Sequence, residues 1–163
     1  METKNKIVKL AKVCHVVAKV LYIIAFVACI AFIALAIALP IADVIEEYTK
    51  SEVAMIFSTL AVYAFILIGL LWNVEGIFKC IVKEGTPFCE GVSHYLKKSA
   101  IFTLILAVVP ALLGTSILGI IYPESELTFP ISISGIVVGA ILLVLGIVFK
   151  YGTELQNRDD ETL

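Results

Sequence analysis

Four long apolar stretches separated by short polar segments dominate the pattern of this 163-residue chain. The first stretch runs for 23 residues without a charge. A helix of that length reaches about 34 Å, enough to cross a hydrocarbon core of about 30 Å. It is also too long for the apolar core of a signal peptide, which is about 7 to 15 residues. The pattern predicts one all-α domain over residues 1–163, an integral membrane four-helix bundle with spans at about 20–42, 53–74, 99–121 and 131–149.

The N-terminal residues 1–19 alternate lysines with apolar side chains at helical intervals. This pattern predicts an amphipathic helix at the membrane interface that leads into the first span. Its apolar side is expected to hold Ile7, Leu10, Ala11, Cys14, Val17 and Ala18.

Between the second and third spans, residues 75–98 predict a helical hairpin. Gly85 is expected to end the first arm in the left-handed conformation that glycine tolerates. Thr86 is then the expected N-cap of the second arm, with Pro87 at its first helical position. We expect this arm to lie along the membrane surface as far as Ser99. A tight connection packed on the ends of the spans and a docking surface for a partner are both open interpretations of this turn.

The distribution of charge predicts the orientation of the chain. Eleven of the twelve Lys and Arg residues lie in the N-terminal segment, the hairpin or the C-terminal tail at 150–163, and the exception is Lys50. By the positive-inside rule, both termini and the hairpin are therefore cytosolic. A hydrophobic content of 61% and a mean hydropathy of +1.06 exclude an ordinary soluble domain. We expect membrane lipids as surroundings and no direct binding of nucleic acid.

Two spans carry small or polar residues on one helical face. In the second span, Thr59, Tyr63 and Asn73 share a face, which predicts hydrogen bonds between helices or, less commonly, the lining of a small pocket. In the fourth span, Gly135 and Gly139 form a small-xxx-small pair that permits a homodimer, although packing inside the monomer is the simpler outcome. In the third span, Pro110 predicts a kink.

No pattern of catalytic or metal-ligating residues stands out. Four cysteines are present, but their spacings to one another and to His94 match no zinc motif, and the cytosolic side favours free thiols. His15 and His94 are isolated in the sequence and have no paired acid or nucleophile. The four predicted spans hold no Asp, Glu, Lys, Arg or His, which argues against an ion pathway. We therefore expect no enzyme, cofactor or metal site.

Two stretches resemble a known family. The turn and the end of the chain, which reads KYGTELQNRDDETL, are similar to those of a bacterial family of four-span membrane proteins, domain of unknown function 2975. Asn157 and Arg158 depart from the resemblance, because acidic residues are common at their positions. The family motifs match Gly85, Pro87 and Phe88 in the turn, and Gly152, Leu155, Gln156, Asp160, Thr162 and Leu163 in the tail.

The resemblance implies a multi-pass protein of the bacterial plasma membrane. It also implies a partner, because members are often encoded beside a small DNA-binding regulator of the Cro/C1 type. The first functional hypothesis is a non-enzymatic regulator or sensor that binds a cytosolic partner through the matched residues of the turn and tail, with Gly152 ending the fourth helix. The alternative is a small transporter, or an immunity protein that acts against a membrane-active compound.

Overall fold

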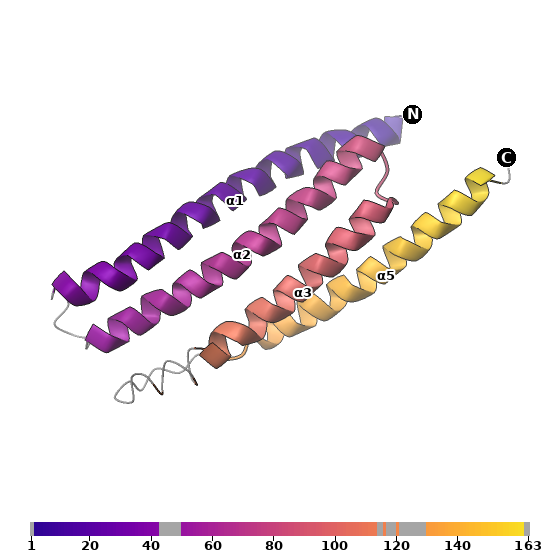
Figure 1. The fold of residues 1–163 in the computed structure, drawn as a ribbon. Coiled ribbons are helices and arrows are strands. Elements are labelled where there is room, and N and C mark those ends of the chain that lie inside the picture. The colour runs from indigo at the N-terminus through magenta and orange to yellow at the C-terminus, as the bar shows by residue number, and fades with distance from the viewer. Residues whose placement is uncertain (1, 43–49, 114–115, 117–119, 121–129, 162–163) are drawn as a thin grey trace.

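The computed structural model describes residues 2–42, 50–113, 116, 120 and 130–161. No strand occurs in this part of the chain, and nearly all of it is helical. All four long helices have the length and apolar composition needed to cross a membrane. The predicted all-α class, with four helices long and apolar enough to span a membrane, is confirmed. The helices are α1 (Glu2–Ala42), α2 (Lys50–Glu84), α3 (Glu90–Leu112) and α5 (Ile133–Glu161) (Figure 1).

The predicted surface segments are continuous with the spans. Residues 2–42 form one helix of 41 residues, so the N-terminal amphipathic segment and the first span are a single element. Likewise, α3 passes through Ser99 without a break, and the predicted change of direction at this residue is wrong. The physical reason is that no glycine or proline interrupts residues 92–109, so the helical hydrogen bonds continue. The helix also passes through Pro110 and ends at Leu112, while most of the remaining predicted span lies outside the described residues.

The helices form an open row. Each packs against its neighbour along the chain: α1 against α2, α2 against α3, and α3 against α5 (Figure 1). In the described parts of the helices, no Cα atoms come within 8 Å between α1 and α3, α1 and α5, or α2 and α5. The predicted four-helix bundle is therefore corrected to a row with two end helices. Lipid tails are as apolar as leucine, so a membrane provides no hydrophobic drive to close such a row.

Small side chains mark the face of α1 that packs on α2. Ala11, Ala18, Ala25 and Cys29 are the buried residues of α1, and the Cys29 thiol donates a hydrogen bond to the Ala61 carbonyl oxygen at 3.7 Å. The apolar side predicted for residues 1–19 is therefore divided. Its small residues Ala11 and Ala18 face α2, whereas its large residues Ile7, Leu10 and Val17 are exposed.

Glycines mark the face of α5 that packs on α3. A Cβ atom on Gly135 would lie 2.8 Å from the Ala107 Cβ, and one on Gly139 would lie 2.7 Å from the Leu104 side chain. Of the two predicted outcomes for this glycine pair, packing inside the monomer is the one observed. A homodimer through the same glycines would require α3 to leave them, so we propose no dimer on this surface.

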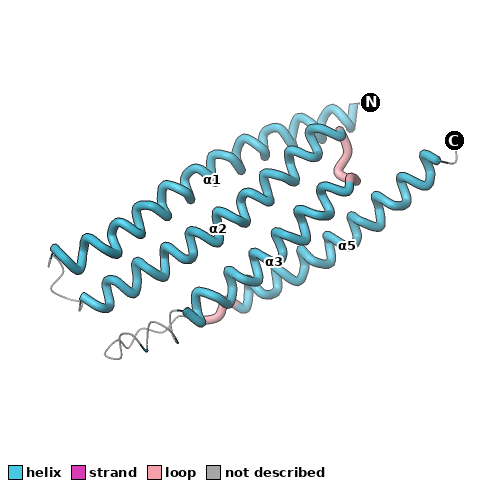
Figure 2. The backbone as a smooth tube through the Cα atoms, viewed as in Figure 1, coloured by secondary structure: helices cyan, strands magenta, loops and turns pink. Residues whose placement is uncertain are grey.

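The alternating helix directions bring several segments to one end of the row (Figure 2). The start of α1, the turn between α2 and α3, and the end of α5 all lie at the same end of the row (Figure 2). Residues that are far apart in the sequence thus come together there, and this end holds the candidate site.

Candidate docking site at the turn between α2 and α3

The turn begins with a glycine in the left-handed region. Gly85 has a φ of 70°, and its N–H donates to the Ile81 carbonyl oxygen at 2.9 Å. This hydrogen bond satisfies a carbonyl group at the end of α2, as a left-handed glycine after a helix commonly does. The predicted role of Gly85 is confirmed.

The start of α3 differs from the prediction. The Thr86 hydroxyl accepts a hydrogen bond from the Phe88 N–H at 3.2 Å, so it stabilises the turn itself. Cys89 is the residue at the N-cap, with an extended backbone (φ −134°, ψ 153°) and no side-chain capping bond. The helix therefore begins at Glu90, and the predicted roles of Thr86 as N-cap and Pro87 as first helical residue are wrong.

Phe88 connects this turn to the last helix. Its ring stacks on the ring of Phe149, with centroids 5.5 Å apart and an interplanar angle of 26°. A Cβ atom on Gly152 would lie 2.8 Å from the same ring. The absence of a side chain at Gly152 therefore leaves the space that Phe88 occupies.

The C-terminal segment is helical well beyond Gly152. Helix α5 continues to Glu161, so the prediction that Gly152 ends the fourth helix is wrong. Two interactions support the helix around this glycine. The Thr153 hydroxyl donates to the Phe149 carbonyl oxygen at 2.9 Å, and Lys150 Nζ lies 3.5 Å from Glu154 Oε1. Such pairs four residues apart stabilise a helix by a few tenths of a kcal/mol.

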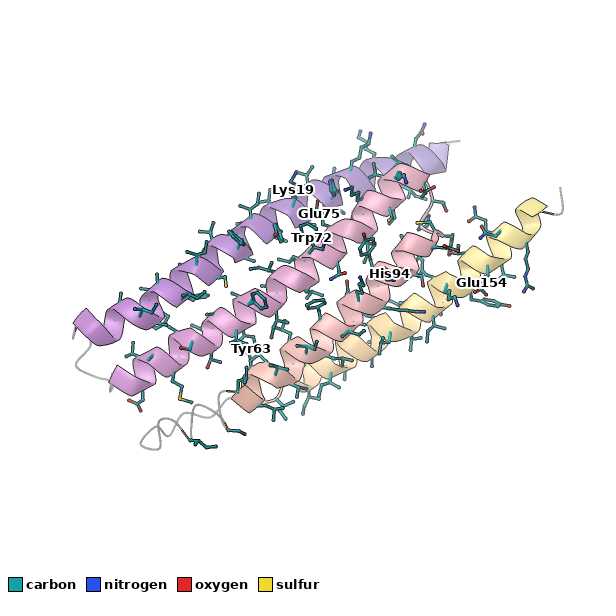
Figure 3. The ribbon with its side chains drawn as sticks, in the orientation of Figure 1. Lys19, Tyr63, Trp72, Glu75, His94 and Glu154 are labelled. Carbon is teal, nitrogen blue, oxygen red and sulfur yellow. The ribbon has the colours of Figure 1, made fainter. Side chains whose placement is uncertain are left out.

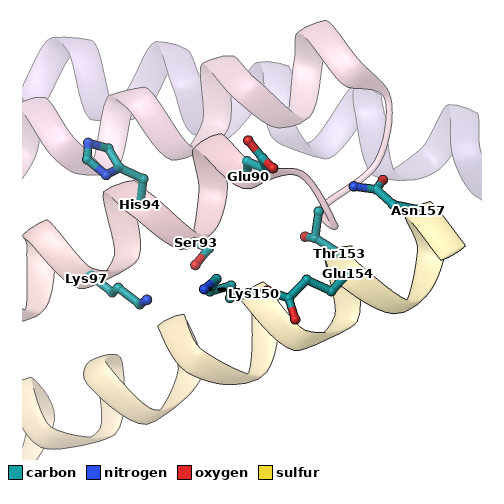
Figure 4. Close-up of a pocket in the computed structure, with 8 residues that line it drawn as sticks. All are labelled: Glu90, Ser93, His94, Lys97, Lys150, Thr153, Glu154 and Asn157. Atoms are coloured by element: carbon teal, nitrogen blue, oxygen red, sulfur yellow. Dashed lines mark ion pairs between the residues drawn. The ribbon is translucent and has the colours of Figure 1, made fainter.

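Two neighbouring cavities lie between the turn, α3 and the C-terminal part of α5. They share Glu90, Thr153 and Asn157. The turn cavity has a volume of about 460 Å³ and is also lined by Cys80, Lys83, Glu84, Thr86, Phe88, Cys89, Gly91 and Gln156. The helix cavity has a volume of about 320 Å³ and is also lined by Ser93, His94, Lys97, Lys150 and Glu154 (Figure 4).

The helix cavity carries both signs of charge. The side chains of Lys97 on α3 and Lys150 on α5 point toward one another (Figure 4). Glu90 and Glu154 add carboxylates to the same lining. The described residues hold no cluster of three metal-ligating side chains. The site therefore offers charged groups and hydrogen-bonding groups near the Phe88 ring.

A buried hydrogen bond fixes α3 against α5 beside this cavity. The Ser93 hydroxyl donates to the Gly146 carbonyl oxygen at 2.8 Å. Gly146 also lies close to α3, because a Cβ atom there would be 2.9 Å from Lys97 Cγ. This contact positions Lys97 at the edge of the cavity.

Replacing Ser93 by alanine is expected to lower the free energy of unfolding by about 1 kcal/mol, because one intramolecular hydrogen bond is lost. Reversible unfolding of the purified chain in mixed micelles measures the change. Thr103→Ser is the matched control. Thr103 donates its hydroxyl to the Ser99 carbonyl oxygen of the same helix at 2.8 Å, and a serine at this position keeps that hydrogen bond. Equal stability of Ser93→Ala and the wild type would contradict the assigned role of Ser93.

The residues predicted to bind a partner are only partly brought together. Phe88 and Gln156 line the turn cavity, and Gly152 packs against Phe88. Leu155 is exposed on the same part of α5, whereas Gly85 and Pro87 are half-buried in the turn without lining either cavity. Asp160 lies within α5, with its side chain outside the described part. Thr162 and Leu163 are outside the described residues altogether.

Sequence reasoning missed the contribution of α3 to the site. Glu90, Ser93, His94 and Lys97 follow one another at spacings of three, one and three, and they all line the helix cavity. This helical spacing indicates a polar face. The polar face could have been predicted from the sequence if residues 90–98 had been treated as the first turns of the third span.

The predicted polar face of α2 does not bond between helices. Thr59 is buried, but its hydroxyl donates to the Met55 carbonyl at 2.9 Å within the same helix. Asn73 likewise donates to the Gly69 carbonyl at 2.6 Å. The preferred prediction of bonds between helices is therefore wrong for both residues, since a carbonyl four residues earlier is already within reach. The alternative prediction, that these residues line a pocket, holds for two of them in separate cavities. Tyr63 lines a largely apolar cavity of about 210 Å³ between α1, α2 and α3, and Asn73 lines one of about 350 Å³ between α2 and α3.

The histidine predicted to be isolated near the N-terminus has an acidic neighbour. His15 Nδ1 lies 3.9 Å from Glu75 Oε1, across the interface of α1 and α2, and both side chains are half-buried. Lys19 and Trp72 lie in the same region of this interface (Figure 3). The prediction of an isolated His15 is corrected, because Glu75 is contributed by another helix. His94 instead contacts the ring of Tyr95, with centroids 5.8 Å apart.

Comparison with known proteins adds no relative. No protein-family model, no curated protein and no solved structure matches the chain. The resemblance to domain of unknown function 2975 therefore stays a prediction.

Proposed function

We propose that this chain is a non-enzymatic, multi-pass membrane protein that regulates or senses by binding a soluble partner. The proposed docking surface consists of the turn 85–89 and the α5 segment 149–157. The observation that carries the proposal is the packing of Phe88 on Phe149 and Gly152. This packing joins two segments about sixty residues apart in the chain into one surface.

The proposed orientation places this surface in the cytosol. Its support is the charge distribution, with eleven of twelve basic residues in the segments that meet at this end of the row. The length of α2 also supports a position of this surface outside the hydrocarbon core. The candidate span in α2 has 33 residues, which corresponds to about 50 Å, so it exceeds a hydrocarbon core of about 30 Å. The excess carries Lys79, Lys83 and Glu84, which favours its placement outside the hydrocarbon.

For the partner, we propose a small DNA-binding regulator of the Cro/C1 type, in a bacterial plasma membrane. This identity is what the resemblance to domain of unknown function 2975 implies. The chemistry of the surface supports a polypeptide partner more generally. Phe88 and Leu155 expose apolar area, and the lysines and glutamates around them can pair with charges at the rim of an interface.

Transport or immunity is the alternative, and its support is one cavity of about 350 Å³ that Asn73 lines together with Tyr95 and Lys98. The cavity beside Tyr63 is largely apolar, and Thr59 and Asn73 direct their donors to their own helix. A solute pathway normally requires polar or ionisable groups along its length. We therefore do not propose transport as a second function.

A photo-crosslinking residue at position 156 tests the docking surface in native membranes. Gln156 lines the turn cavity, so this position is expected to capture a soluble helix-turn-helix protein, identified by mass spectrometry. The matched control is position 148, because Val148 is exposed on the apolar part of the same helix and is expected to capture only lipid or membrane protein. Leu155→Glu is expected to reduce capture from position 156 by roughly tenfold, as loss of about 1.4 kcal/mol would.

Three results would contradict the proposal. One is capture of the same species from positions 148 and 156. Another is capture that is unaffected by Leu155→Glu. The third is capture at position 156 of lipid alone, which would identify this end of α5 as a lipid contact.

A further inference from the structure

Two of the four free cysteines meet at the turn. Cys80 is in the last part of α2 and Cys89 is the residue before α3. Nine positions separate them in the sequence, yet both are half-buried and both line the turn cavity. The fold therefore places two thiols on the wall of one cavity.

The surroundings leave room for the Cys80 thiol. A Cβ atom on Gly91 would lie 2.5 Å from Cys80 Sγ, so the sulfur occupies the space that a side chain at this position would fill. Cys14 and Cys29 are placed differently. Both lie on α1, and the Cys29 thiol donates to the Ala61 carbonyl oxygen within the packed interface with α2. Among the described residues, the turn brings two of these four thiols onto one cavity.

We propose that Cys80 and Cys89 are a site of reversible oxidation that forms an intramolecular disulfide in response to low-molecular-weight disulfides such as oxidised glutathione. This inference does not depend on the proposed docking function. Disulfides in reducing compartments are usually transient and serve redox sensing. A pair of thiols on one cavity, one of which can resolve an adduct on the other, has the arrangement that such sensing requires.

The reaction balances with one molecule of oxidised glutathione. The thiolate of one cysteine attacks a sulfur of glutathione disulfide, which forms a mixed disulfide and releases one glutathione thiolate. The thiolate of the second cysteine then attacks the cysteine sulfur of that mixed disulfide and releases the second glutathione. One bond forms between Cys80 and Cys89, and the two protons end on the two glutathione thiols. Two electrons pass from the protein to glutathione.

The turn can accommodate the new bond. A disulfide requires a sulfur–sulfur distance of about 2.05 Å, so the two thiols must approach each other. Cys89 is the N-cap of α3 with an extended backbone, and its carbonyl oxygen accepts from the Val92 N–H at 3.1 Å. Its side chain makes no capping bond, so rotation of this side chain can bring the sulfur toward Cys80 without breaking either helix. The bond would join the end of α2 to the residue that follows Phe88. Oxidation is therefore expected to restrict the turn around Phe88.

Titration of the purified full-length chain with defined ratios of reduced and oxidised glutathione tests the proposal. Free thiols are trapped by alkylation, and peptides are identified by mass spectrometry without reduction. We expect a peptide pair joined between Cys80 and Cys89, exceeding the mixed glutathione adducts at either residue by roughly tenfold or more, because the second thiol lines the same cavity. Cys14 and Cys29 serve as internal controls and are expected to remain alkylatable.

Serine variants separate the two steps. In Cys80→Ser the adduct on Cys89 has no resolving thiol, so stable glutathionylation of Cys89 is expected, and Cys89→Ser is expected to show the converse. The proposal is overturned if the wild-type chain accumulates a glutathione adduct on one of the two residues while the other stays free. It is also overturned if the joined peptides link Cys80 or Cys89 to Cys14 or Cys29 instead. The wild-type titration needs no variant, so a poorly folded variant does not decide the result.

Discussion

Replacing Gly152 by leucine is expected to force the Phe88 ring away from α5 and so to separate the two parts of the docking surface, the turn 85–89 and the α5 segment 149–157. The reason is steric, since even a Cβ atom at this position would lie 2.8 Å from the ring. Such overpacking typically costs about 1–3 kcal/mol. We expect a lower melting temperature in detergent and a fall in partner capture from position 156 of roughly tenfold or more.

The control for this variant is the adjacent position. Tyr151 is exposed on α5, so Tyr151→Leu is expected to leave both the melting temperature and capture unchanged. A double-mutant cycle with Phe88→Ala then isolates the contact. Because removal of the ring relieves the clash, Gly152→Leu is expected to cost much less in the Phe88→Ala background, with a coupling of about 1–3 kcal/mol. Additive effects of the two changes would contradict the assigned contact between Phe88 and Gly152.

Replacing Gly139 by leucine is expected to separate α5 from α3. A Cβ atom there would lie 2.7 Å from the Leu104 side chain and 3.4 Å from the Ala100 carbonyl oxygen. The Ala100 backbone cannot move aside as a flexible side chain can. We therefore expect the free energy of unfolding to fall by about 3 kcal/mol, at the upper end of the range for overpacking. Among the described helices α5 packs only against α3, and its other contact is with Phe88 of the turn, so no second helix interface compensates for the loss. Reversible unfolding in mixed micelles measures the change.

The neighbouring residue provides a matched comparison. Ala140 is exposed on α5, so Ala140→Leu adds the same kind of side chain to a face that α3 does not contact. It is expected to leave the free energy of unfolding within about 0.5 kcal/mol of the wild type. If both variants are equally stable, or equally unstable, the assigned helix interface is incorrect.

The fold class was predictable because it depends on residue type and length. Uninterrupted apolar stretches of about 20 residues leave few structures other than membrane-spanning helices, since every backbone polar group must be bonded internally. Helix ends were harder to predict. Gly85 ends α2 as expected, whereas Gly152 lies inside α5. The two glycines look alike in the sequence, but the first supplies a left-handed backbone and the second supplies space for Phe88.

The site was predictable only in part, for a similar reason. Phe88, Gly152 and Gln156 were identified from two separate sequence motifs, but nothing in the linear pattern shows that they meet. Lys97 and Ser93 were missed because their helix was assigned to the membrane surface and not to the start of α3. The placement of Cys80 and Cys89 on one cavity depends on a turn geometry that their spacing of nine does not encode.

The sequence by itself determined the four spans, the all-α class and the left-handed turn at Gly85. These features follow from local hydrophobicity, helical periodicity and the backbone freedom of one glycine. Only the tertiary structure decided that the helices form an open row, which faces of α1 and α5 are buried, and that the turn meets the C-terminal helix. These features depend on which surfaces fit together, because small residues such as Ala11, Gly139 and Gly152 act through the neighbours that approach them.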